Sequence, residues 1–288
     1  MKSFSSPILL SVLMALLPVA GIGQSADTIK VMTYNIYHGE DPENPGSSNI
    51  EDVAMLIRNE RPDFVALQEV DSLTGRSARL NNGVPQNLVE KLADLTGMHG
   101  YFGKAINFDG GGYGEGILTP HPVSVEKVML PIPKGGEKRA LLVARTELDE
   151  GGELLFAGTH LCHQYPENRA AQMQKINEFF SGADIPVILG GDLNFTPGSD
   201  PYNILRDQWI DMAQNVGLPE ATYPYGDPEK RIDYLLVHAA MRDVVEVVDL
   251  RVLGGRLLRS PPGRCHAEDL QLKCRRFVPT LLSAMSFA

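Results

Sequence analysis

Oxygen-bearing side chains stand at the ends of several apolar, strand-like runs of this sequence. Asn35 ends "VMTYN", Glu69 ends "FVALQE", and Asp192 and Asn194 end "VILGGDLN". A buried strand gains nothing from a carboxylate or amide at its end, because burying such a group without a partner is costly. Carboxylates and amides without thiolates suit a hard cation such as Mg²⁺ or Mn²⁺. The pattern therefore predicts a metal-assisted site where these side chains converge.

Two further polar residues stand at strand ends. His160 ends "LLFAGTH", and Asp233 opens "DYLLV". A histidine beside such a site can act as an acid or stabilise charge on a phosphoryl group, whose oxygen a metal would polarise. The sequence also allows other interpretations, in which Asn35 is a turn residue, His160 a surface histidine, and Asp233 an ion-pair partner of Arg231.

The segment "GGDLN" is the most informative of these. Its glycines let the backbone approach a neighbour closely, and the Asp-x-Asn spacing puts two oxygen-bearing side chains on one side of an extended chain. The sequence contains no G-x-S-x-G elbow, Walker A loop or H-E-x-x-H helix. "DGGGYGEG" lacks the Lys-Ser/Thr of a P-loop, and we expect it to be a flexible loop at the rim of the site.

Short apolar runs rich in Val, Ile and Leu must position these residues. Three helices are predicted: one after Ser48, which forms a capping box with Glu51, one from near Pro85 to Gly97, and one from near Pro166 to Gly182. Between the last two, strands follow each other without helices, which favours layered, antiparallel or mixed sheets over a pure βαβ array. The predicted strands are "IKVMTYNI", "DFVALQEV", "GILT", "ALLVART", "LLFAGTH", "PVILGGDL" and "IDYLLV".

The composition limits the class of protein. The chain of 288 residues is 43% hydrophobic and 22% charged, as in a globular protein of one large or two small domains. The three cysteines, Cys162, Cys265 and Cys274, are too few for a disulfide framework. A net charge of −10 argues against tight, non-specific nucleic-acid binding. It does not exclude phosphate esters, because a metal ion can supply positive charge. We expect a monomer.

The N-terminal segment is typical of a secretory signal peptide. A basic start at Lys2 is followed by an apolar run from Ile8 to Val19 and by small residues. The run is shorter than the roughly 20 residues of a membrane helix. We expect a signal peptide over residues 1–24 with cleavage near Gly23–Ala26, a secreted or periplasmic protein, and no stable membrane insertion. A retained membrane anchor is the alternative.

Taken in order, these segments resemble the endonuclease/exonuclease/phosphatase superfamily, which has the DNase I-like fold. The matches are "MTYNI", "RPDFVALQEV", "YGEGIL", "GTHL", "ILGGDLNFTP" and "RIDYLLV". The resemblance implies an α/β fold over residues 27–258, a four-layered sandwich of two mixed β-sheets face to face, flanked by helices. It also implies metal-dependent cleavage of a phosphoester by an activated water. Known members cleave DNA, RNA, sphingomyelin and inositol phosphates, so the expected substrate is a nucleic acid, a phospholipid or a sugar phosphate.

The resemblance assigns roles by position. Glu69 is similar to the principal metal ligand, with Asn35 beside it. Asp192 and Asn194 are similar to the pair that orients the attacking water and the phosphate. His160 falls where many members place a phosphate-contacting histidine.

Three other residues match the pattern of the family less closely. Asp233 is similar to the acid of the penultimate strand. Arg139, in "KRALLVART", is expected to face the substrate. Glu115 stands where many members have Asn after "YG", and we assign it to substrate binding together with Arg139.

The C-terminal segment departs from the family, whose last strand opens with Ser-Asp-His-x-Pro. No such motif occurs here, and His266 in "CHAED" is a poor substitute. We therefore predict that the last strand is missing or disrupted and that residues 259–288 form an aberrant tail.

The genetic code offers a reason for this departure. Residues Leu258 to Asp269 can be encoded so that a one-base shift reads Ser-Asp-His-Leu-Pro-Val-Val-Ala-Thr-Leu-Lys. We hypothesise that a shift at or just before Leu258 scrambled the C-terminus, in the gene or in the sequencing. Without the Asp-His pair, activity should be severely reduced. The alternative function is a catalytically disabled family member that binds a metal or a phosphate ligand.

Overall fold

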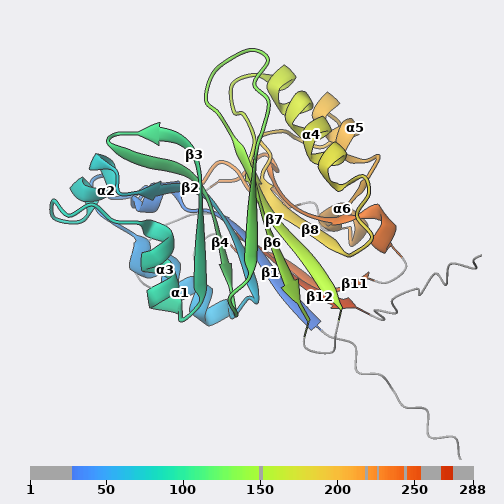
Figure 1. Cartoon of the computed structure of the whole chain (residues 1–288), viewed down its shortest axis with the longest axis horizontal. Helices are drawn as coiled ribbons and strands as arrows, with labels where there is room; N and C mark the ends of the chain where they lie inside the picture. The colour runs from blue at the N-terminus through green and yellow to red at the C-terminus, as the bar shows by residue number, and fades with distance from the viewer. Residues whose placement is uncertain are drawn as a thin grey trace, which may run out of the picture.

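The computed structural model describes residues 28–148, 152–217, 220–225, 227–242, 245–253 and 267–274. The predicted signal peptide lies outside these ranges, as do His266 and most of the predicted tail. The described residues form two six-stranded β-sheets that face each other, with helices on the outer sides (Figure 1).

The first sheet contains the first and the last of the described strands. Its strands are β1 (Thr28–Asn35), β2 (Phe64–Ser72), β3 (His99–Phe108), β4 (Gly111–Thr119), β11 (Val245–Leu253) and β12 (Ala267–Cys274). They lie in the order β11-β12-β1-β2-β4-β3. Only the β1–β2 pairing is parallel, so the sheet is mixed.

The second sheet is built from the middle of the chain. Its strands are β5 (Ser124–Met129), β6 (Ala140–Glu147), β7 (Glu153–His160), β8 (Val187–Asp192), β9 (Trp209–Asp211) and β10 (Asp233–His238). The order is β5-β6-β7-β8-β10-β9, with β7 and β8 parallel. This sheet is therefore also mixed.

The helices lie on both outer sides, α1 to α3 beside the first sheet and α4 to α6 beside the second (Figure 1). Their bounds are α1 (Ile50–Glu60), α2 (Gly75–Leu80), α3 (Leu88–Thr96), α4 (Pro166–Phe180), α5 (Asp200–Leu205) and α6 (Met212–Asn215), with 3₁₀ turns η1 (Tyr37–Gly39) and η2 (Ala239–Met241). None of the described helices is long and apolar enough to cross a membrane.

Three apolar clusters hold the layers together. Phe64, Ile117 and Phe156 belong to the cluster between the two sheets. Ile57 of α1 belongs to a second cluster on the outer face of the first sheet, and Met173 of α4 to a third on the second sheet. Each such buried side chain stabilises the fold by about 1.5–3 kcal/mol. The predicted four-layered α/β sandwich with two mixed sheets is confirmed.

The predicted capping box is wrong. Helix α1 has Asn49 as its N-cap residue, without a side-chain cap, and Ser48 accepts a hydrogen bond of 3.3 Å from the N–H of Ile50. The backbone of Ser48 forms a β-bridge with Glu40, so the helix begins after it. The other two predicted helices correspond to α3 and α4, and Gly97, with φ 73°, caps α3 as expected.

The last strand also differs from the sequence prediction. We expected it to be missing or disrupted, yet Ala267–Cys274 forms a strand that pairs with both β1 and β11. In the sequence of this segment, Leu270 and Leu272 alternate with Gln271 and Lys273, which is the period of a strand. Without this segment, β1 would have one unpaired edge and β11 would have no partner among the described strands.

Candidate active site

A cavity of about 1060 Å³ opens beside the strand ends of both sheets. The structure brings seven of the eight predicted site residues to its wall. They are Asn35, Glu69, Arg139, His160, Asp192, Asn194 and Asp233.

Three of these residues lie in a row across the second sheet. His160 of β7 is in register with Asp192 of β8, and Asp192 is in register with Asp233 of β10. The close approach of β8 to β7 requires the glycine before Asp192, because a Cβ on Gly191 would lie 2.2 Å from the carbonyl oxygen of Thr159. The "GG" of the sequence thus serves to place the acid beside the histidine.

Glu69 enters the site from an irregularity of the first sheet. The pairing of β2 with β4 shifts between Leu67 and Val70, and Glu69 between them has φ 59°. This left-handed conformation is uncommon outside glycine and costs of order 1–3 kcal/mol. Because a bulge re-aims the side chain that it carries, Glu69 reaches Asn35 at the end of β1.

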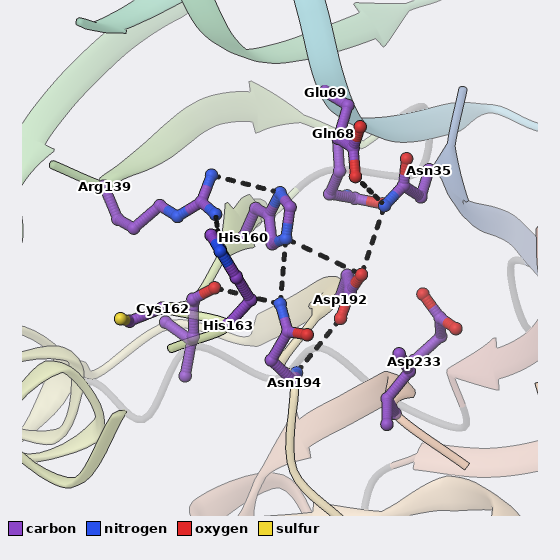
Figure 2. A network of polar contacts seen from close by, with 12 residues as sticks. Asn35, Gln68, Glu69, Arg139, His160, Cys162, His163, Asp192, Asn194 and Asp233 are labelled. Carbon is purple, nitrogen blue, oxygen red and sulfur yellow. Dashed lines mark hydrogen bonds and ion pairs between the residues drawn. The ribbon is translucent and has the colours of Figure 1, made fainter. Parts of the chain in front are cut away.

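The amide of Asn35 connects the two sheets (Figure 2). Its Nδ2 donates to Glu69 Oε1 at 3.0 Å and to Asp192 Oδ2 at 3.1 Å. Its Oδ1 accepts a hydrogen bond of 3.1 Å from the backbone N–H of Tyr37, which fixes the orientation of the amide. One amide therefore holds two carboxylates from opposite sheets together.

These two carboxyl groups differ in proton affinity. Burial alone would raise the pKa of Glu69, but His38, His160 and the amide of Asn35 outweigh it and lower the pKa to about 2. Burial raises the pKa of Asp192, despite hydrogen bonds from Asn35 and from the backbone of Asn194. Glu69 is therefore suited to stay ionised, and Asp192 to accept a proton.

Nitrogen donors gather beside these carboxylates around Arg139, which is 3% exposed, and His160 Nε2 lies 3.6 Å from Asp192 Oδ2. Its Nη1 lies 2.6 Å from Glu137 Oε1 and 3.3 Å from His160 Nδ1, and its Nη2 lies 3.3 Å from His163 Nδ1. Burial and the charge of Arg139 hold the pKa of His160 well below its ordinary value, so its ring is neutral.

His160 has more donors around it than it can accept from. Arg139 faces its Nδ1, and Asn194 Nδ2 lies 2.9 Å from its Nε2. Asn194 Nδ2 also donates to the carbonyl of Leu161 at 3.0 Å, which fixes this amide as well. A neutral imidazole accepts at only one nitrogen. The oxygens of an anion bound here would supply the missing acceptors.

Glu115 is the predicted site residue that does not line the cavity. It is 1% exposed. Burial raises its pKa to about 8, against the charge of Arg139. Asp233 does line the cavity, and Arg231, its alternative partner, binds Asp211 through both terminal nitrogens.

Several residues of the site were not predicted from the sequence. Tyr113 lines the cavity from β4, within the segment expected to be a flexible loop, and that expectation is wrong over β4. The glycines of β4 permit this strand to lie close to β3, since a Cβ on Gly114 would lie 2.1 Å from the carbonyl oxygen of Gly103. Glu137 and His163 also line the cavity. The spacing of three residues after the predicted histidine in "THLCHQ" was the available signal for the latter.

Within the described ranges, no group of three or more His, Cys, Asp or Glu side chains converges as a metal cage. The residue types nevertheless fit a hard cation, since the carboxylates of Glu69 and Asp192 are held together by the amide of Asn35, 3.0 and 3.1 Å from its Nδ2. Mg²⁺ is commonly bound through one or two carboxylates and keeps several waters.

Fold and cavity together define a four-layered α/β sandwich protein with a polar site at the ends of its strands. The chain belongs to the endonuclease/exonuclease/phosphatase family, whose model matches residues 32–254. The resemblance found in the sequence is thereby confirmed, and it points to a hydrolase of phosphoesters. Among curated proteins, no relative matches the chain.

Solved structures share the fold. An endonuclease/exonuclease/phosphatase from Beutenbergia cavernae DSM 12333 is 24% identical, with a TM-score of 0.66 over 86% of this chain and 72% of that chain. The mannosyl-6-phosphatase of Bacteroides thetaiotaomicron VPI-5482 is 17% identical, with a TM-score of 0.65 over 85% and 99%. The human Nocturnin catalytic domain, with bound sulfate, is 18% identical, with a TM-score of 0.63 over 85% and 94%.

Proposed function

We propose that this protein is a secreted or periplasmic, metal-dependent phosphoesterase that hydrolyses a phosphodiester or phosphomonoester by attack of water. The observation that carries the proposal is a cavity in which carboxylates and nitrogen donors adjoin. Carboxylates of Glu69 and Asp192 meet at the amide of Asn35. Beside them, Arg139 and Asn194 direct N–H groups at both ring nitrogens of His160, which accepts at only one of them. A cation and a phosphate anion are the pair of charges that such a site complements.

In this mechanism Glu69 and Asn35 would hold Mg²⁺ or Mn²⁺, beside Asp192. When bound, the ion supplies positive charge that polarises the phosphoryl group. Asp192 accepts the proton of the attacking water, a role favoured by its raised pKa. Asp233, in register with it, adds a second carboxyl group beside the water.

The phosphoryl oxygens face the nitrogen donors of the cavity. Arg139 and the neutral ring of His160 donate to them, and Asn194 orients the phosphate through its amide. These groups are held by contacts made without the substrate, so they are preorganised for charge that develops during the reaction.

The substrate is proposed to be a nucleic acid, a phospholipid or a sugar phosphate. One relative by fold is a mannosyl-6-phosphatase and another holds a sulfate anion. The cavity of about 1060 Å³ is much larger than a phosphoryl group and can hold part of the leaving group. The net charge of −10 disfavours a processive DNA binder. Export would suit scavenging of extracellular phosphoesters, and N-terminal sequencing of the mature protein would test it.

A second candidate function is supported by the C-terminal sequence. The Ser-Asp-His-x-Pro motif that closes the family is absent. A chain without its Asp and His would be impaired as an enzyme and could serve as a module that binds a metal or a phosphate ligand.

Hydrolysis of bis(p-nitrophenyl) phosphate and p-nitrophenyl phosphate by the full chain tests the proposal. We expect hydrolysis with Mg²⁺ or Mn²⁺, its loss in chelator, and its loss in Glu69→Gln. Binding of inorganic phosphate without hydrolysis would favour the binding module, and neither binding nor hydrolysis would overturn both functions. A panel of DNA, RNA, phospholipid and sugar phosphates would then identify the substrate.

A further inference from the structure

The loop between β7 and α4 is held by buried amides. Asn168 and Gln172 are 0% exposed on the face of α4 where apolar residues are usual. Gln172 Oε1 accepts from the N–H of Cys162 at 2.9 Å. Asn168 donates to the carbonyl of Gly135 at 2.8 Å and accepts from the N–H of Lys134 at 2.9 Å. These bonds fix the backbone of two neighbouring segments beside the cavity.

Arg169, which follows Asn168 in α4, also fixes the loop between β7 and α4. Arg169 Nη1 donates to the carbonyl of Cys162 at 2.9 Å and to that of His163 at 3.1 Å. Between these anchors the side chain of His163 is exposed and lines the cavity. A polar side chain presented by a rigidly held loop is typical of a binding site.

His163 and His160 share one guanidinium (Figure 2). Arg139 Nη2 lies 3.3 Å from His163 Nδ1, and Arg139 Nη1 lies 3.3 Å from His160 Nδ1. Because a guanidinium can only donate, Nδ1 of each ring accepts, and a neutral ring carries its proton on Nε2. The Nε2 of His160 meets Asn194. For Nε2 of His163, no partner is found within the described residues.

We propose that His163 is a second substrate-contacting histidine, which donates its Nε2–H to an anionic oxygen of the phosphate. The inference rests on the proposed function and assigns one more donor to the same site. Arg139 orients the ring through Nδ1, and the pinned loop holds the backbone. The contact adds a histidine from the β7–α4 loop to a site whose C-terminal motif is absent.

Two substitutions of His163 distinguish the role of its Nδ1 from the role of its Nε2. In His163→Asn the side-chain amide reaches the position of Nδ1 and can still accept from Arg139, but the Nε2 donor is lost. In His163→Gln the amide reaches the position of Nε2 and can still donate to the phosphate. His121→Gln is the matched control, because His121 is exposed and does not line the cavity.

The full chain with Mg²⁺ is titrated with inorganic phosphate by calorimetry, and kcat/KM is measured on bis(p-nitrophenyl) phosphate. We expect His163→Asn to weaken phosphate binding and lower kcat/KM by about tenfold to a hundredfold, the range for one hydrogen bond to a charged group. We expect His163→Gln to retain most of the phosphate affinity and kcat/KM that His163→Asn loses, and the control His121→Gln to stay within about threefold of wild type.

Wild-type behaviour of His163→Asn would overturn the inference, and so would equal losses in both variants, because the ring would then act through Nδ1 or packing alone. If the wild type binds phosphate but hydrolyses no ester, the proposed function fails while the dissociation constants still decide the role of His163. If the wild type binds no phosphate, the inference is overturned as well.

Discussion

Asn35, on the first sheet, donates a hydrogen bond of 3.1 Å to Asp192, on the second. The same nitrogen donates to Glu69 at 3.0 Å. The site is therefore complete only when the two sheets are packed, and neither sheet alone carries the pair of carboxylates with its amide.

Removal of this amide should damage both stability and activity. In Asn35→Ala the carboxylates of Glu69 and Asp192 lose their common donor, and a buried acceptor left without its partner costs about 1–3 kcal/mol. We expect the free energy of unfolding in urea to fall by this amount, and kcat/KM by roughly a hundredfold or more. Asn215→Ala, at an exposed position on α6, is the control. Full activity of Asn35→Ala would contradict the proposed site.

Asp192→Asn should separate activity from stability. The substitution keeps the shape of a side chain whose carboxylate is disfavoured by burial. We expect hydrolysis to fall by about 10²–10⁴-fold, the usual contribution of an acid–base group. In chelator at pH 8 we expect the free energy of unfolding to be unchanged or higher. Asp94→Asn, at an exposed position, is the control. Hydrolysis at the wild-type rate would remove Asp192 from the mechanism.

Glu115 should make stability depend on pH. Its pKa is raised by burial from 4.5 to about 8, so the folded state binds a proton that the unfolded state has released between these values. Stability from this group is present below about pH 4.5 and is lost as pH rises through about 8, at about 1.4 kcal/mol per unit of pKa difference.

Glu115→Gln removes the titration and keeps the shape. Urea unfolding of both chains at pH 5 and pH 9 measures the effect, and we expect wild type to lose more stability than the variant. Equal losses would show that Glu115 is ionised in the folded protein at neutral pH.

The hypothesis of a frameshift near Leu258 can be tested directly by sequencing the gene. Sequencing the gene around codon 258 should give codons that read Ser-Asp-His-Leu-Pro in the shifted frame. A chain restored to that frame should gain activity by about a hundredfold or more, since it regains an acid–base pair. Codons that forbid the motif would end the frameshift hypothesis, whatever the activity of the restored chain.

Most of the site residues that could be predicted from the sequence lie at the ends of strands. Apolar runs that end in His160, Asp192 and Asp233 identify neighbouring strands, and the register sets these residues side by side. The conformation of Glu69, with φ 59°, depends on a bulge that only pairing with β4 creates, and the sequence carries no local signal for it.

Other features could not be predicted from local sequence patterns. Tyr113 and Glu115 are two residues apart on one face of β4, yet only Tyr113 lines the cavity, because Glu115 lies deeper in the protein. The polar residues Asn168 and Gln172 on the buried face of α4 contradict a simple amphipathic pattern. These two side chains are polar because they form hydrogen bonds with backbone groups that come earlier in the chain, the carbonyl of Gly135 and the N–H of Cys162.

The place of β12 has a consequence for how the chain is made. Strand β1 begins at Thr28, but its neighbour on one side, Ala267–Cys274, is synthesised after all the other described strands. Until then β1 keeps an open edge that other chains can join. Pairing over so long a sequence separation is also slow, because the loop must close before the contact stabilises it. A ribosome-bound or truncated chain would therefore need protection from aggregation until β1 and β12 pair.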